Sequence, residues 1–74
     1  MTMIQLHVVP YNGQWALRWA NSTSVVATYR TKEEAVAAGR QLARQHGAEL
    51  VIHRLDGTIQ ERDSYGNDSY PPRG

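Results

Sequence analysis

The sequence predicts one α+β domain, in which a single helix covers one face of a small, mostly antiparallel sheet. Short alternating apolar stretches flank Asn12-Gly13 and Asp56-Gly57, and both dipeptides are typical of hairpin turns. Residues 31–47 have helical periodicity with start and stop signals. A chain of 74 residues allows one domain with a thin core. The expected order is three strands, the helix and two further strands, so residues 1–74 form one unit.

The first hairpin is expected to turn at Asn12-Gly13, which places Leu6 opposite Trp19 and Val8 opposite Leu17. Both strands then agree on their apolar side, which supports this register. One face has Leu6, Val8, Trp15, Leu17 and Trp19, and the other has Gln5, His7, Gln14 and Arg18. A third, β-branched strand is expected over residues 25–30.

The helix is expected to begin after Thr31, whose side chain can cap the helix together with Glu34 three residues later. Gly47 is placed to end it in a left-handed conformation. The inward face consists of small residues and one leucine, so we expect close packing on the sheet at Gly39.

The second hairpin is expected to use Asp56-Gly57 as a two-residue turn. Val51 then faces Arg62, and residues 53 and 54 face residues 60 and 59. One side has Leu50, Ile52 and Ile59, and the other has Glu49, His53, Thr58, Gln60 and Arg62. The sequence leaves open which early strand the fourth strand joins.

The amino-acid composition and net charge exclude several classes of protein. The chain has no cysteine, which excludes disulfides and thiolate metal sites and fits a reducing cytoplasm. No apolar run approaches the roughly 20 residues of a membrane span, and the beginning of the chain does not resemble a signal peptide. A net charge of +1 is far from the strongly basic balance of many nucleic-acid-binding proteins. We expect a cytoplasmic protein without a membrane partner.

Catalytic chemistry has little support in the sequence. It contains neither a Gly-x-Ser-x-Gly elbow nor a glycine-rich phosphate loop, so we expect no catalytic residue, no cofactor and no small-molecule substrate. His7 and His53 could converge on a metal if their strands were neighbours. However, Glu49 is the sole carboxylate expected on that face, and it lies too far along the strand from His53 to share an ion. A histidine-centred metal or enzyme site is therefore a distant alternative, and we expect none.

The outer face of the sheet is the most informative surface. Arginine and glutamine are residues that read base edges and bind phosphates. An antiparallel sheet with one face in water would also expose polar residues there. The pattern alone therefore does not distinguish a binding surface from a solvent-exposed face. The candidate contacts for a partner or nucleic acid are His7, Arg18, Arg30, His53, Gln60 and Arg62.

Residues 64–74 are expected to form an irregular tail rich in tyrosine and proline. Tyrosine suits interfaces, and Pro-Pro favours an extended polyproline conformation. The tail is expected to dock on a sheet, either its own or a partner's, through Tyr65, Tyr70, Pro71 and Pro72. The sequence leaves open whether that docking occurs within one chain or between chains.

Several stretches closely resemble the bacterial family called domain of unknown function 2188. They are "HVVPYNGQWALR", "TKEEAVAAGRQLARQHGAELVIHRLDGTIQERDSYGND" and "PPRG", and they extend from His7 to Gly74. One position departs from the family pattern, which favours proline after Asp68 where this chain has Ser69. The resemblance implies a small bacterial cytoplasmic domain and carries no established activity.

A shorter stretch, "ATYRTKEEAVAAG", is similar to the strand-to-helix junction of plant ethylene-response-factor DNA-binding domains and of some phage-integrase arm-binding domains. Those domains read DNA with the outer sheet face. We therefore expect a non-catalytic interaction module that binds a protein partner or itself, with nucleic-acid binding through the outer face as the alternative.

Overall fold

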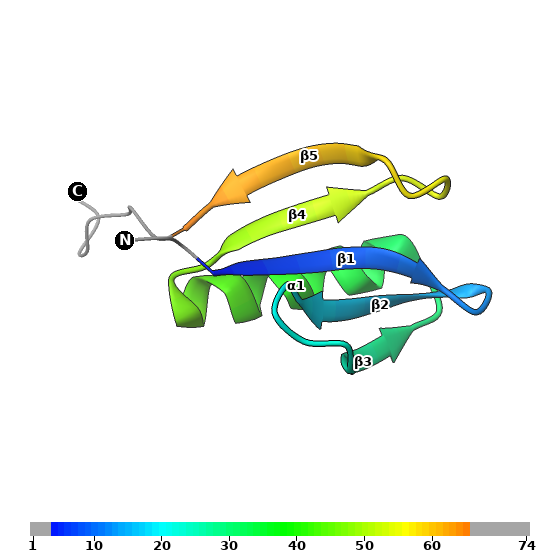
Figure 1. Ribbon diagram of the computed structural model, residues 1–74, viewed down its shortest axis with the longest axis horizontal. Coiled ribbons are helices and arrows are strands. Elements are labelled where there is room, and N and C mark those ends of the chain that lie inside the picture. Colours follow the sequence, from blue (N-terminus) through cyan, green and yellow to red (C-terminus); the bar gives the residue numbers. More distant parts are fainter. Residues whose placement is uncertain (1–3, 66–74) are drawn as a thin grey trace.

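The computed structural model describes residues 4–65, in which five strands form one sheet with the helix packed on one face (Figure 1). The strand order across the sheet is β3-β2-β1-β4-β5, and every neighbouring pair is antiparallel except the parallel pair β1 and β4. The predicted fold class is confirmed. In chain order the elements are β1 (Gln5–Tyr11), β2 (Gln14–Trp19), β3 (Val25–Tyr29), α1 (Lys32–His46), β4 (Glu49–His53) and β5 (Ile59–Ser64).

Helix α1 carries the chain from the edge strand β3 back across the sheet, so that β4 lies beside the central strand β1 (Figure 1). The backbone N–H of Glu49 donates to the carbonyl of Ile4 over 2.9 Å at the start of this pairing. The register then places Gln5 beside Glu49 and His7 beside Val51. This parallel pair determines which side chains are neighbours on the outer face of the sheet, because it joins the two hairpins in one sheet.

The first hairpin has the predicted register. Leu6 lies opposite Trp19 and Val8 opposite Leu17. Asn12 and Gly13 have φ angles of 48° and 79°, as a two-residue turn with left-handed backbone requires.

The second hairpin differs from the prediction near its turn. The N–H of Gly57 donates to the carbonyl of Arg54 over 2.9 Å, so the central turn residues are 55 and 56. Gly57 follows with φ 91°, which is the geometry of a turn that ends in a bulge.

A shift in strand pairing accompanies this longer turn. Val51 faces Arg62 as predicted, but the register shifts between Ile52 and His53, and His53 then faces Ile59. The predicted pairs of residues 53 with 60 and 54 with 59 are therefore wrong. Ile59, expected on the apolar side, is 41% exposed.

The core lies between α1 and the sheet and is built from large sheet residues and small helix residues. The buried sheet residues are Leu6, Val8, Leu17, Leu50 and Ile52, and the buried helix residues are Ala35, Gly39 and Ala43. Trp15 and Trp19 are partly buried and pack against this cluster. The small helical face predicted from the sequence is confirmed, and it brings the helix close to the sheet.

Both helix ends have the predicted caps. The Thr31 hydroxyl accepts from the backbone N–H of Glu34 over 3.1 Å. Gly47 has φ 61° and ψ 40°, and its N–H donates to the carbonyls of Ala43 and Arg44. The helix spans 15 residues, and within residues 4–65 no helix is both long and apolar enough to cross a membrane.

The last described residues belong to the folded domain. Strand β5 includes Ser64, which corrects the expectation that the irregular tail begins there. Tyr65 donates its N–H to the carbonyl of Ala48 over 3.1 Å, and its ring packs against the core of its own chain. The predicted contacts of Tyr70, Pro71 and Pro72 lie outside the described residues.

Candidate functional site

A row of basic side chains crosses the outer face, which is the face of the sheet that α1 does not cover. Strand pairing places Arg18 of β2 beside His7 of β1, His7 beside Val51 of β4, and Val51 beside Arg62 of β5. We call Arg18, His7 and Arg62 the basic row. Adjacent strands lie about 4.8 Å apart. Two residues of the first hairpin and one of the second therefore present positive or titratable groups along one line across the sheet.

His7 and His53 meet on this face. Nδ1 of His7 lies 2.7 Å from Nε2 of His53, and the ring planes are inclined by 29°. The ring centroids are 4.9 Å apart. This separation exceeds the nitrogen–nitrogen distance by about two ring radii, so the rings meet edge to edge. The geometry is that of an N–H···N hydrogen bond.

The outer nitrogen of each ring also has a fixed partner. Nε2 of His7 lies 3.2 Å from Oε1 of Gln5, and Nε2 of that amide donates to Oε1 of Glu49 over 2.7 Å. Nδ1 of His53 lies 2.9 Å from the carbonyl oxygen of Gly57. The chain of contacts therefore runs from the carboxylate of Glu49 through both rings to the turn of the second hairpin.

These partners determine where the protons lie. The carboxylate of Glu49 holds the amide nitrogen of Gln5, so the amide oxygen faces His7 and can only accept. Nε2 of His7 must then donate, and Nδ1 of His53 must donate to the Gly57 carbonyl. Each ring is therefore already protonated on the nitrogen that points away from the other ring. The two inner nitrogens, Nδ1 of His7 and Nε2 of His53, face one another.

Burial is the largest cause that lowers the pKa of His7 below its ordinary value of 6.5. The charges of His53, Arg18 and Arg62 lower this pKa further, whereas the Glu49 carboxylate opposes them. His7 therefore tends to stay neutral where an isolated imidazole would take a proton.

The two histidines fulfil the condition under which the sequence allowed a metal site, because their strands are neighbours. Two nitrogens that ligate one zinc ion at about 2.0–2.1 Å in tetrahedral geometry lie roughly 3.3 Å apart, farther than the 2.7 Å of this pair. Among residues 4–65, no three His, Cys, Asp or Glu side chains gather as metal ligands. The pair fits a proton better than a metal ion.

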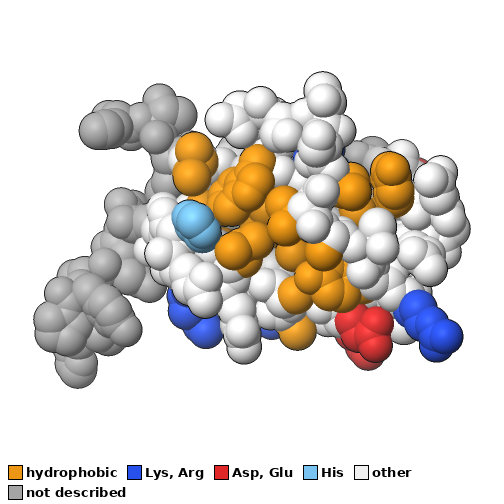
Figure 2. Space-filling model, turned by 90° about the horizontal axis from the view of Figure 1, so that it is seen from below, with side chains coloured by type: hydrophobic (Ala, Val, Ile, Leu, Met, Phe, Trp, Pro, Cys, Tyr) orange, Lys and Arg blue, Asp and Glu red, His pale blue; other side chains and the backbone are white. Residues whose placement is uncertain are grey.

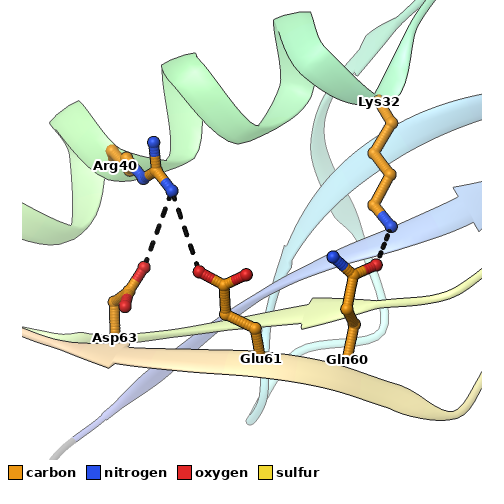
Figure 3. Close-up of polar contacts among 5 residues, drawn as sticks. All are labelled: Lys32, Arg40, Gln60, Glu61 and Asp63. Atoms are coloured by element: carbon orange, nitrogen blue, oxygen red, sulfur yellow. Dashed lines mark hydrogen bonds and ion pairs between the residues drawn. The ribbon is translucent and has the colours of Figure 1, made fainter.

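Two predicted contact residues lie away from the basic row. Arg30 is exposed and follows the edge strand β3. Gln60, predicted on the outer face, accepts a hydrogen bond from Nζ of Lys32 on the helix side (Figure 3). The register shift in the second hairpin explains this difference, because a shift by one residue reverses the direction of a side chain.

The edge of β3 is a second candidate surface. A groove of about 230 Å³ separates this strand from the helix. Val26 lines it and is 47% exposed, and Figure 2 shows apolar side chains gathered on this side of the molecule. The lining residues are Leu17, Val26, Tyr29, Ala38, Gln41, Leu42 and Gln45.

The sequence did not indicate the roles of Gln5 and the Gly57 carbonyl. His7, His53 and Glu49 were all expected on the outer face, but their contacts depend on the parallel pairing of β1 with β4. Val51 was also missed as a buried residue of this face, where it is 1% exposed between His7 and Arg62. A period-2 pattern places side chains on a face but does not reveal which strands adjoin.

Comparison with known proteins identifies the family. Residues 6–65 match the family model described as an uncharacterized protein conserved in bacteria, DUF2188. The chain belongs to this family.

Among curated proteins, the chain is similar to the uncharacterized protein YdaT of Bacillus subtilis (strain 168). The two are 28% identical over 61 residues, a region that covers 82% of this chain and 41% of YdaT. The chain thus spans about two-fifths of the length of the relative it matches. No solved structure matches the chain.

Proposed function

We propose that the chain is a non-catalytic interaction module that associates with a second copy of itself through the edge of β3. The observation that carries this proposal is the contrast between the two edges of the sheet. Strand β3 has the sequence VVATY, without a charge or a proline, whereas β5 contains Glu61, Arg62 and Asp63. Charged residues on an edge strand oppose pairing with another strand, and an uncharged edge permits it.

The groove beside β3 supports the same proposal. Pairing of β3 with β3 about a two-fold axis would extend the sheet and bring two identical edges together. Because the strand has no charge, this self-pairing creates no like-charge repulsion within the strand. Val26 and Tyr29 line the apolar groove, so the second copy would cover exposed apolar surface as well as backbone groups.

The test is the mass of the chain in solution, measured by light scattering over a range of concentrations. We expect a dimer that becomes a monomer in Val26→Lys, because a charge on the edge opposes pairing. Ile59→Lys is the matched control, since Ile59 is a β-branched residue of similar exposure on the opposite edge. A monomeric wild-type chain, or a dimer unaffected by Val26→Lys, would refute the proposal.

Nucleic-acid binding through the outer face is the second candidate, and the basic row favours it. Arg18 and Arg62 flank His7 on one line, where both guanidinium groups can approach a phosphate backbone. Arg18 also donates to the carbonyl of Ser22 over 3.2 Å, which holds its side chain in place.

Binding through this row should weaken steeply with salt. Arg18→Ala and Arg62→Ala should each reduce affinity for single- or double-stranded DNA or RNA. Arg40→Ala is the control, because Arg40 lies on the helix and pairs with Glu61 and Asp63. Absence of a gel shift at low salt would exclude this candidate.

A further inference from the structure

We propose that His7 and His53 form a proton-sharing pair that carries one positive charge, with His53 as the imidazolium and His7 as the neutral partner. The inference rests on the hydrogen bonds of four ring nitrogens. It is independent of the partner that the domain binds.

The number of protons follows from the contacts. Nε2 of His7 donates to Gln5, and Nδ1 of His53 donates to the Gly57 carbonyl, because neither oxygen has a hydrogen to give. Two neutral imidazoles have only these two N–H groups, so their inner nitrogens would face each other with lone pairs at 2.7 Å. One further proton between the rings converts this repulsion into a charge-assisted hydrogen bond.

A second added proton would make the contact between the two rings repulsive again. The pair would then carry two positive charges, and two N–H groups would face each other across the same short distance. The pair therefore takes up its protons in two separated steps that belong to both rings together.

The surroundings favour His7 as the neutral member of the pair. Burial acts most strongly against a positive charge on His7, and Arg18 from β2 and Arg62 from β5 add to its effect. Glu49 from β4 acts in the opposite direction, but its carboxylate accepts from Gln5.

The charged groups of the adjacent hairpin are engaged locally. The guanidinium of Arg54 donates to the hydroxyl of Thr58 and the carbonyl of Ile59. The Asp56 carboxylate accepts from the backbone and the hydroxyl of Thr58. Nδ1 of His53 donates to the Gly57 carbonyl over 2.9 Å, a shorter contact than the 3.2 Å from Nε2 of His7 to Gln5, so we place the charge on His53.

The shared proton links pH to the properties of the outer face. Because His53 shares the proton with His7 of the basic row, uptake of the proton adds one positive charge next to that row. The same proton joins β1 to β4 across the parallel pair that unites the two hairpins.

The test is nuclear magnetic resonance of the imidazole nitrogens in the ¹⁵N-labelled chain as pH is varied. Over the range between the two steps, we expect His7 as the neutral Nε2–H tautomer and His53 protonated on both nitrogens. We also expect a scalar coupling across the hydrogen bond between Nδ1 of His7 and Nε2 of His53. His46 provides an internal reference, because it lies on the helix and contacts the edge of the Trp19 ring.

His53→Gln should merge the two steps, so that His7 titrates in one step, and His46→Gln should leave both steps unchanged. Should His53→Gln fail to fold, the ring states of the wild-type chain still decide the matter. Independent single-step titration of His7 and His53 in the wild-type chain, or two neutral rings throughout, would overturn the proposal.

Discussion

Gly39 of α1 lies directly against Leu50 of β4. A Cβ atom at position 39 would come within 3.0 Å of Cδ1 of Leu50 and 3.1 Å of Cδ2 of Leu17. Both leucines are completely buried, so neither can move far to make room. The helix reaches the sheet at this point because residue 39 has no side chain.

We therefore expect Gly39→Val to lower the free energy of unfolding by about 1–3 kcal/mol through overpacking. The measurement is urea denaturation. Ala37→Val is the matched control on the exposed side of the same helix, where the poorer helix propensity of valine costs less than about 1 kcal/mol. Equal losses in the two variants would show that the packing at Gly39 is not the cause.

Thr31→Ala should destabilise the domain by about 1 kcal/mol, because the N–H of Glu34 loses its acceptor at the helix start. Thr31→Asp should retain most of this stability, since aspartate is also a good N-cap and suits the helix dipole. Thermal unfolding of the two variants measures the difference. An alanine variant as stable as the aspartate variant would contradict the capping role.

Arg40→Ala should change the free energy of unfolding by no more than about 0.5 kcal/mol. Nη2 of Arg40 lies 3.9 Å from Oε2 of Glu61 and 3.8 Å from Oδ2 of Asp63, and all three side chains are at least one-third exposed (Figure 3). Solvent therefore screens the attraction. A typical point mutation lowers the free energy of unfolding by about 1 kcal/mol. A larger loss than this in urea denaturation of Arg40→Ala would contradict the expectation.

The second turn should contribute a stability that disappears in acid. The backbone N–H of Thr58 lowers the pKa of Asp56 below 3.8, and the Thr58 hydroxyl adds to this effect. The contribution is present above pH 3.8 and is lost as pH falls through the lower folded value. Asp56→Ala should therefore have a lower melting temperature than wild type at pH 6, with a smaller difference in strong acid.

Asp56→Asn is the control for this pH dependence. Its amide oxygen can still accept from Thr58, but it does not titrate. A difference between wild type and Asp56→Ala that stays constant with pH would assign the effect to turn geometry alone.

His7 should make the domain less stable as pH falls below 6.5. Its folded pKa is lowered, so the unfolded chain binds more protons between 6.5 and the folded value, and stability rises with pH there. Urea denaturation at several pH values should show a smaller pH dependence of the free energy of unfolding in His7→Gln. The control His46→Gln should keep the contribution of His7 to this pH dependence. An unchanged pH dependence in His7→Gln would refute the assignment.

Local patterns determined much of the fold. Asn12-Gly13 set the first hairpin register, because an odd shift would place Leu6 and Val8 on the wrong face. Thr31 and Gly47 marked the helix ends, because unpaired backbone groups require partners within a few residues. The α+β class followed from these elements.

The second hairpin shows where local patterns fail. Asp56-Gly57 suits both a two-residue turn and a longer turn with a bulge, and the dipeptide does not distinguish them. The bond from Gly57 to the Arg54 carbonyl selects the longer turn. As a result, Gln60 lies on the helix side and Ile59 faces His53.

The sequence by itself determined the helix, the first hairpin and the presence of His7, His53 and Arg18 on a polar face. Only the tertiary structure decided that β4 joins β1 in parallel and that the two imidazoles meet at 2.7 Å. The physical reason is that alternation along a strand fixes the face of each side chain, whereas the neighbour of a strand depends on how the helix returns the chain across the sheet. His7 and His53 are 46 residues apart in the sequence, and that return brings their rings into contact.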